Sequence, residues 1–352
     1  MQEDRIVLLG LNPTELKTVV SNLGMPAFTA KQIAEWLYVK GVESFGEMTN
    51  ISKSNREKLE QNCTIGRMDP LEKLKSRDKT MKFLFPTSNG KFVETVYIPD
   101  HERATLCISC QVGCKMNCLF CQTGKQGFHG NLKASDILNQ IYYVNNNLGA
   151  LTNIVFMGQG EPLDNLDAVL RTIDVLTGDY GWQWSPRRIT VSTCGLKKGL
   201  HRFISECECN LAISLHSPIP EQRAMLMPAE KAYSITAMVK DLQKYDFSHQ
   251  RRLSFEYTVF KGVNDSQTHV RELIKLLDGL DCRINLIRFH ALPPESAAEC
   301  PLQPASDERM EAMRDYLSSH GVFTTIRASR GEDIMAACGL LSTQRMENNQ
   351  TT

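Results

Sequence analysis

From about residue 104 onward, short apolar runs alternate with longer segments in which apolar residues recur every three or four positions. The short runs predict strands, and the longer segments predict amphipathic helices. Strands that alternate with helices through right-handed crossovers form a parallel sheet. We therefore expect an α/β fold whose sheet is open or curled into a partial barrel. The expected strands are residues 104–109, 153–157, 188–192, 210–215, 253–259 and 283–288, followed by a helix at 307–319 and a strand at 323–327.

The first 70 residues follow a different pattern, with amphipathic segments that open near Pro13, Thr29 and Ser52. These segments predict a small helical domain. Two strand-like runs at 80–85 and 91–98 then flank turn-forming residues, which predicts a β-hairpin. Basic residues stand at the entrance to this hairpin, namely Lys73, Lys75, Arg77, Lys79 and Lys82. The expected division is 1–70 for the helical N-terminal domain, 71–103 for a basic linker and β-hairpin, 104–340 for the α/β domain and 341–352 for a C-terminal tail.

Composition excludes some classes of protein. Of the 352 residues, 42% are hydrophobic and 23% are charged, which is typical of a soluble globular protein. Lys plus Arg and Asp plus Glu each number 40, and this neutral total does not exclude nucleic acid, because a neutral chain can carry a basic face. No apolar run approaches the ~18 residues of a membrane-spanning helix, and the acidic start of the chain does not fit a signal peptide. We expect a cytoplasmic protein that does not bind membranes.

The cysteines are the strongest indication of the chemistry of this chain. The chain has 12, and 5 of them fall between Cys107 and Cys121. Because the cytosol keeps thiols reduced, such a cluster indicates metal or redox chemistry rather than disulfide staples. Cys114, Cys118 and Cys121 can converge on one centre, and three ligands on a four-iron cluster leave one iron open for a substrate. The alternative is a zinc knuckle, which needs a fourth ligand such as Cys107, Cys110 or a distant His.

Further candidate residues follow the expected strands. Gly160 and Glu161 come after the strand at 153–157, where glycines let a ligand approach the backbone and a carboxylate can accept hydrogen bonds from an ammonium group. The carboxyl ends of parallel strands face one crevice, so a shared ligand is the economical interpretation. The alternatives are that the glycines only reverse the direction of the chain and that His216, at the end of the strand at 210–215, has a structural role. The other candidates at strand ends are Ser192, Ser214, Leu215 and His216.

Cys338 is a second informative thiol, although a free cysteine is more often a small buried apolar residue. Cys107 stands apart from the three clustered cysteines, so these two thiols could meet in one cavity. A nucleophilic thiolate needs cationic or polar surroundings, and Arg327 and Arg330 lie near Cys338 in the sequence.

The motif Cys114-x-x-x-Cys118-x-x-Cys121, with Phe120 before the last cysteine, resembles the radical S-adenosylmethionine superfamily. The segments 121–128, 156–163, 214–217 and 336–339 resemble the RlmN/Cfr family, whose members methylate adenosine carbon atoms in RNA. The resemblance spans nearly the whole chain, including residues 29–53. It implies a partial (β/α)6 radical-SAM barrel with a helical N-terminal domain that binds RNA.

The resemblance also implies site residues. Cys114, Cys118 and Cys121 would hold a [4Fe-4S] cluster, and S-adenosylmethionine would contact Gly160, Glu161, Ser192, Ser214, Leu215, His216 and His290. Cys338 would take a methyl group from one S-adenosylmethionine by direct displacement, while a second molecule would be reduced to the 5′-deoxyadenosyl radical. Cys107 would then resolve the protein–RNA bond, with a disulfide bond as the expected outcome. Glu94 would act as proton acceptor, whereas the residue pattern alone indicates a solvated strand position.

The segment 124–128 resembles the RlmN type, so carbon 2 of adenosine is the expected target. The expected partners are 23S rRNA at the peptidyl transferase centre, the adenosine 3′ to the anticodon in tRNA, and an electron donor such as flavodoxin or ferredoxin. RNA phosphates would contact the helical segment around Lys31 and the basic run from Lys73 to Lys82. We expect a monomer. The alternatives are a Cfr-type carbon-8 methyltransferase and a non-catalytic, zinc-stabilised RNA-binding protein.

The chain departs from the family pattern at several positions. His290 stands where the family has Asn, and Met335 stands where it has Asp. Gln122 replaces Ala, while Cys110 and Cys194 replace small residues. Cys110 could close the cluster as a fourth ligand and abolish the open iron. We disfavour this because Cys110 is expected on a strand rather than in the loop.

Overall fold

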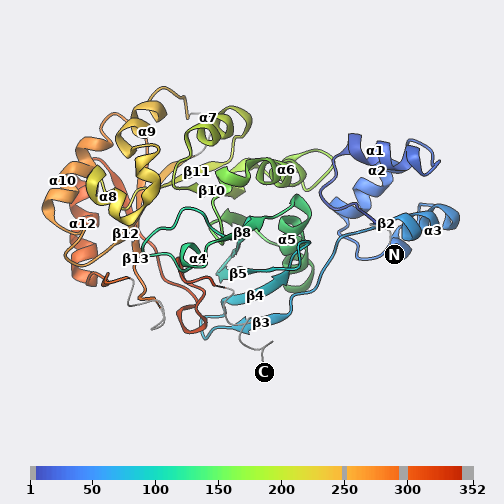
Figure 1. Cartoon of the computed structure of the whole chain (residues 1–352), viewed down its shortest axis with the longest axis horizontal. Coiled ribbons are helices and arrows are strands. Elements are labelled where there is room, and N and C mark those ends of the chain that lie inside the picture. The colour runs from blue at the N-terminus through green and yellow to red at the C-terminus, as the bar shows by residue number, and fades with distance from the viewer. Residues whose placement is uncertain (1–4, 248–251, 293–299, 343–352) are drawn as a thin grey trace.

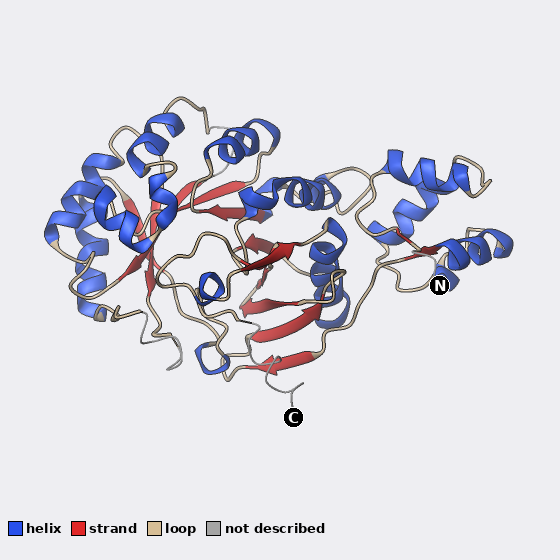
Figure 2. Cartoon of the chain, in the orientation of Figure 1, coloured by secondary structure: helices blue, strands red, loops and turns tan. Residues whose placement is uncertain are grey.

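A computed structural model describes residues 5–247, 252–292 and 300–342. Its main feature is a ten-stranded sheet in the order β14-β13-β12-β11-β10-β9-β6-β5-β4-β3 (Figures 1 and 2). From β6 to β14 all neighbouring strands are parallel, which confirms the expected sheet. These strands are β6 (Arg103–Cys107), β9 (Asn153–Phe156), β10 (Ile189–Thr193), β11 (Asn210–Ser214), β12 (Leu253–Val259), β13 (Arg283–Arg288) and β14 (Phe323–Ile326).

The helices between the parallel strands cover the outer side of the curled sheet, with α7 to α10 and α12 along it in Figure 1. Side-chain caps fix where several of them begin: Ser266 accepts a hydrogen bond from the His269 amide, and Ser306 accepts one from the Arg309 amide. The helices are α5 (Ala134–Leu148), α6 (Leu166–Thr177), α7 (Lys197–Glu206), α8 (Pro220–Leu226), α9 (Ile235–Leu242), α10 (Gln267–Leu276) and α12 (Asp307–Ser319). Short 3₁₀ turns lie at Pro162–Asn165, Pro186–Arg188, Pro228–Lys231 and Glu332–Ile334.

The expected hairpin is present as β4 (Met81–Pro86) and β5 (Phe92–Asp100), which pair antiparallel. β5 also pairs with β6, so the hairpin extends the sheet of the parallel strands rather than standing apart from it. A further strand, β3 (Glu72–Lys75), was not expected. All four of its residues are exposed and three are charged, so its sequence lacks the apolar alternation that indicates a strand.

The N-terminal segment contains α1 (Pro13–Asn22), α2 (Thr29–Ala34), α3 (Lys53–Asn62), a π-helical turn at Glu35–Val39 and a 3₁₀ turn at Phe45–Glu47. Two short parallel strands, β1 (Ile6–Val7) and β2 (Cys63–Thr64), bring its ends together. It contacts the sheet domain through a hydrogen bond from the Tyr142 hydroxyl to the Tyr38 carbonyl (2.8 Å) and an ion pair between Arg171 and Glu15 (2.7 Å).

A small separate sheet, β7 (Gln111–Gly113) with β8 (Phe128–Asn131), frames the cysteine loop, which also contains the short helix α4 (Gln122–Lys125). Cys110 lies in the connection between β6 and β7, so the expectation that it belongs to a strand is wrong. Of the expected C-terminal tail, residues 343–352 lie outside the described residues. No helix in the described ranges is both long and apolar enough to cross a membrane.

Candidate active site

A cavity of about 170 Å³ opens at the carboxyl ends of the parallel strands. All three cysteines of the loop line it, namely Cys114, Cys118 and Cys121. Five of the expected cofactor contacts line it as well, namely Gly160, Glu161, Ser192, Ser214 and His216. Cys338 completes this set, although it lies more than 120 residues beyond His216 in the sequence. The fold therefore gathers nine of the expected site residues around one cavity.

The cysteine loop closes tightly between β7 and β8. The Cys114 amide donates to the Gly127 carbonyl (3.0 Å), and the Cys121 amide donates to the Cys118 carbonyl (3.1 Å). Gly113 has φ +71°, and a Cβ on it would lie 1.7 Å from the Gly127 carbonyl oxygen, so only glycine fits there.

The three thiols suit an iron–sulfur cluster as donors, because soft sulfur ligands favour such centres. Burial raises the pKa of Cys114 to about 12 and raises the pKa of Cys118 and of Cys121, so cluster binding must displace their protons. Cys110 is buried and does not line the cavity. Within the described ranges, no group of three or more His, Cys, Asp or Glu side chains is arranged so that it could hold a single metal ion.

Gly160 and Glu161 follow β9 as expected. Gly160 has φ +102°, and a Cβ on it would lie 2.5 Å from Cβ of Gln111, so a larger residue would strain the turn. The Glu161 carboxylate is buried and accepts hydrogen bonds from the Thr193 hydroxyl (2.5 Å), the Cys194 amide (2.9 Å) and the Leu163 amide (3.0 Å). Burial raises the pKa of Glu161, while these donors oppose the rise. The carboxylate is thus held rigidly and still has lone pairs for an ammonium group.

His216 lines the cavity as a neutral imidazole. Its Nδ1 accepts a hydrogen bond from the Thr258 amide (2.9 Å), which places its proton on Nε2. Burial, reinforced by the Arg223 charge, lowers the pKa of His216 to about 3. Ser214 ends β11, as expected, and Ser192 is the last residue but one of β10, which ends at Thr193. Leu215 does not line the cavity, since its side chain is fully buried and its carbonyl faces Arg223.

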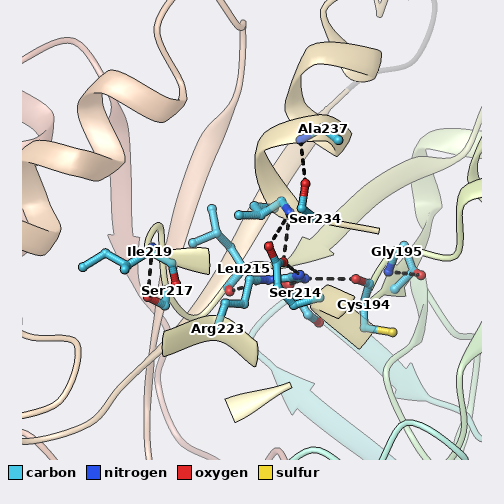
Figure 3. Close-up of polar contacts among 12 residues, drawn as sticks. Cys194, Gly195, Ser214, Leu215, Ser217, Ile219, Arg223, Ser234 and Ala237 are labelled. Carbon is cyan, nitrogen blue, oxygen red and sulfur yellow. Dashed lines mark hydrogen bonds and ion pairs between the residues drawn. The ribbon is translucent and has the colours of Figure 1, made fainter. Parts of the chain in front are cut away.

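The sequence analysis did not identify Arg223, although this side chain holds the strand ends together (Figure 3). The side chain is fully buried. Its Nε donates to the Leu215 carbonyl (3.0 Å), and its Nη2 donates to the carbonyls of Ser214 (2.8 Å) and Cys194 (3.0 Å). Its charge is paired with Glu230, which also accepts from the Ile235 amide (2.9 Å). A single arginine on the amphipathic segment 220–226 looks like a surface residue, so the sequence held no signal for this role.

Glu256 was also missed. It lies on β12 and lines the cavity, where its Oε1 accepts from Asn285 Nδ2 (2.7 Å) and from Arg327 (3.4 Å). Its Oε2 is buried and has no hydrogen-bond partner among the described residues. A buried carboxylate oxygen without a hydrogen-bond partner destabilises a folded protein. Its presence here is consistent with a site that binds a ligand with hydrogen-bond donors. The signal was present in the sequence: an acidic residue within a strand whose other residues are mostly apolar.

Cys107 lies near Cys338 but lines neither of the cavities that Cys338 lines, so the expectation that the two thiols share one cavity stays a prediction. Cys107 ends β6 and packs with Ala336 and Leu341 of the loop that carries Cys338. Burial and the neighbouring Cys338 raise the pKa of Cys107 to about 12, and the Arg327 charge acts against the rise. Removal of its thiol from bulk water also raises the pKa of Cys338, again opposed by Arg327, although the residue as a whole is exposed.

Glu94 does not line the cavity, and the solvated position that its sequence pattern indicates is wrong. Its buried carboxylate pairs with Lys82 (2.8 Å) and accepts from the Ser342 amide (2.6 Å). Lys82 is therefore not available as part of an exposed basic run, which corrects the expectation that it contacts RNA. The structure does not bring His290 into the cavity either. Its Nε2 hydrogen-bonds the Ser329 hydroxyl (2.8 Å) in a neighbouring cavity.

Comparison with known proteins agrees with this arrangement. Residues 6–65 match the family model described as "Ribosomal RNA large subunit methyltransferase N-terminal domain", and residues 108–277 match "Radical SAM superfamily". The chain is 61% identical over 342 residues to a "Probable dual-specificity RNA methyltransferase RlmN" of Bacteroides thetaiotaomicron, covering 97% of each protein. The chain belongs to the RlmN family of radical SAM RNA methyltransferases.

More distant relatives of the RlmN family match over the same extent. The "Dual-specificity RNA methyltransferase RlmN" of Marinobacter nauticus is 39% identical and is covered to 93%, with 96% of this chain aligned. Among solved structures, a radical SAM methyltransferase from Sphaerobacter thermophilus superposes with a TM-score of 0.89 at 36% identity, covering 96% of this chain and 99% of that one. Membership of the radical SAM superfamily implies a [4Fe-4S] cluster and S-adenosylmethionine, which decides against the zinc-stabilised module.

Proposed function

We propose that this chain methylates carbon 2 of adenosine in 23S rRNA and in tRNA, with Cys338 as the carrier of the methyl group. One observation carries the proposal: Cys338 lines the cavity of the cysteine loop, and the residues on either side of it, Ala336 and Leu341, pack with a second thiol, Cys107, that binds no cluster in our assignment. The names of the relatives favour dual specificity for RNA of the RlmN type.

The bound cluster and S-adenosylmethionine, two molecules per turnover, would supply an electrophilic methyl group and a hydrogen-abstracting radical. Carbon 2 of adenine is electron-poor, so an electrophilic methyl group cannot alkylate it directly. A protein-bound carbon radical can add to it. This chemical mismatch is the reason why a carrier thiol is needed.

In this scheme Cys338 attacks the methyl group as a thiolate, and Arg327 favours that thiolate against the effect of burial. Glu161 and His216 would orient the cofactor, the first as an acceptor for its ammonium group and the second as a neutral donor.

After addition to adenine, Cys338 is joined to the RNA through the former methyl carbon. The adduct would lose one electron to the oxidised cluster and its carbon-2 proton to a base, which restores the aromatic ring. Cys107 would then attack the Cys338 sulfur as a thiolate. The sulfur–carbon bond would break with its electron pair on carbon, which takes up a proton and stays on the RNA as a methyl group, while the two cysteines form a disulfide that the external reductant must reopen.

We propose Glu94 as the proton acceptor of this sequence, as in the family. The contacts of its carboxylate with Lys82 and Ser342 support an additional role in holding the loop that carries Cys338. We further propose that the protein acts in the cytoplasm as a monomer and takes electrons from a carrier such as flavodoxin or ferredoxin.

The test is to map the product. Protein reconstituted with cluster without oxygen would be incubated with S-adenosylmethionine, reductant and either a 23S rRNA fragment or tRNA. The RNA would then be digested and analysed by mass spectrometry. We expect 2-methyladenosine from both substrates. Recovery of 8-methyladenosine would instead support the Cfr-type alternative, and unmodified RNA from both substrates would contradict the proposal.

A further inference from the structure

A second cavity, of about 380 Å³, adjoins the first. The two cavities share Ile287, Arg327 and Cys338. Its walls come from paired residues of β5 and β6, with Asp100 and Arg103, from the end of β13 and from the residues that follow β14. These strands stand far apart in the order of the sheet, so the cavity lies where the two sides of the curled sheet approach each other. Cys338 therefore stands at the boundary between the cofactor cavity and a lateral opening.

The second cavity is rich in arginine. Arg103, Arg288, Arg327 and Arg330 line it, against one lining carboxylate, that of Asp100. This concentration of charge is local, because the whole chain is formally neutral. Burial lowers the pKa of His290, so this lining histidine adds no charge near neutral pH.

These arginines keep donor groups free for a ligand. Arg103 is exposed and forms no ion pair with a described residue. Arg330 pairs with Asp100 through one nitrogen (2.8 Å), and Arg288 pairs with Asp307 through one nitrogen. The Nε of Arg288 is buried and has no hydrogen-bond partner among the described residues. A guanidinium has five N–H donors, so several remain on each residue.

Guanidinium groups suit phosphate oxygens, which they bind through pairs of N–H donors. The apolar part of the wall, with Ile98, Ile287 and Ala336, offers a surface for the flat face of a base. The volume lies within the range of pockets that enclose a small ligand, so it suits one nucleotide rather than a double helix.

We propose that the second cavity receives the RNA nucleotide to be modified. Arg103, Arg288 and Arg330 contact the phosphates on either side of it, and the base faces Cys338. The Cys338 thiol then needs little movement between the cofactor on one side and the base on the other. This inference rests on the proposed function, since it names the RNA site of that reaction.

Because Arg330 is paired with Asp100, changes to the two residues should alter RNA affinity in opposite directions. Asp100 competes with phosphate for Arg330, so Asp100→Asn should tighten RNA binding, whereas Arg330→Gln should weaken it. If the ion pair only stabilised the fold, both variants would change the affinity for RNA in the same direction. Arg202→Gln is the matched control, because Arg202 lies exposed on α7 and pairs with Asp167 and Glu206 outside both cavities.

The experiment is fluorescence anisotropy with the full chain and a labelled anticodon stem-loop RNA, at several salt concentrations. We expect Arg103→Gln and Arg330→Gln to weaken binding roughly tenfold each and to reduce the salt dependence by about one phosphate contact. We expect Asp100→Asn to bind more tightly than the unmodified chain and Arg202→Gln to bind equally. Thermal melting would establish that each variant is folded.

Two outcomes would overturn the site: affinities and salt slopes of Arg103→Gln and Arg330→Gln that equal those of Arg202→Gln, or a loss of affinity in Asp100→Asn that matches the loss in Arg330→Gln. Product mapping on the unmodified chain separates this failure from failure of the proposed function. Normal methylation with unaffected arginine variants would reject the site alone. Weakened binding in those variants, with no methylated adenosine from the unmodified chain, would support the RNA site and reject the reaction.

Discussion

Lys82 and Glu94 form a buried ion pair across the β4–β5 hairpin, with Nζ and Oε1 2.8 Å apart. Both residues also contact the loop that carries Cys338. Lys82 donates to the Met335 carbonyl (3.4 Å), and Glu94 accepts from the Ser342 amide (2.6 Å). The pair thus binds the chain three residues before Cys338 and four residues after it. The hairpin, expected from the sequence as a linker, anchors the proposed methyl carrier.

Lys82→Met should therefore impair the reaction as well as stability. The change leaves Glu94 buried without its partner, and removal of one member of a buried pair costs about 3–5 kcal/mol. Urea denaturation would measure that loss, and the rate of Cys338 alkylation by iodoacetamide would report the loosened loop. Lys75→Met on the exposed strand β3 is the control. An alkylation rate equal to that of the control would show that the pair does not hold the loop.

Arg223→Met should destabilise the chain by about 3–5 kcal/mol, because Glu230 is left buried and three carbonyls lose a donor. Since those carbonyls belong to residues beside the cofactor cavity, affinity for S-adenosylmethionine should fall as well. Calorimetric titration of the folded variant would measure this. Arg271→Met, at an exposed position of α10, should change neither quantity. Unchanged cofactor affinity in Arg223→Met would limit its role to stability.

His216 should make stability depend on pH. Its pKa of about 3 lies below the ordinary value of 6.5, so the unfolded chain binds the proton more tightly than the folded chain between these values. The stabilisation is complete above pH 6.5 and is lost as the pH falls toward 3. At pH 5 the loss is about 2 kcal/mol, since one pKa unit corresponds to about 1.4 kcal/mol. Urea denaturation from pH 7.5 to 5 should show a shallower slope for His216→Gln, and parallel curves would contradict this.

Gly160→Ala should abolish cofactor binding with only a modest effect on the rest of the fold. Its φ of +102° disfavours any side chain, and the new Cβ would press on Gln111. The turn that presents Glu161 would have to shift. Gly262→Ala also places a side chain at a positive φ, but in open space away from the cavity, and it serves as the control for backbone strain. Equal cofactor affinity in both variants would show that the Gly160 turn does not shape the site.

The sequence predicted the parallel strands because their apolar runs are fully buried, as in β12, where all seven residues are buried. The strand-end residues followed from the same logic, since parallel strands end at one edge. Arg223 and Lys82 could not be predicted, because their partners are backbone carbonyls and carboxylates brought near only by the fold. His290 adjoins its strand as expected, yet its ring faces the neighbouring cavity, which chain position alone does not determine.

The central claim is that Cys338 carries the methyl group and Cys107 releases the product. The most direct measurement is a denaturing gel of each single variant after incubation with cofactor, reductant and RNA. Cys107→Ala should still attach to adenosine and accumulate as a covalent protein–RNA species, because the thiol that releases Cys338 is missing. Cys338→Ala should form no such species, and neither variant should yield methylated RNA. A covalent species in Cys338→Ala, or normal methylation by Cys107→Ala, would contradict the account.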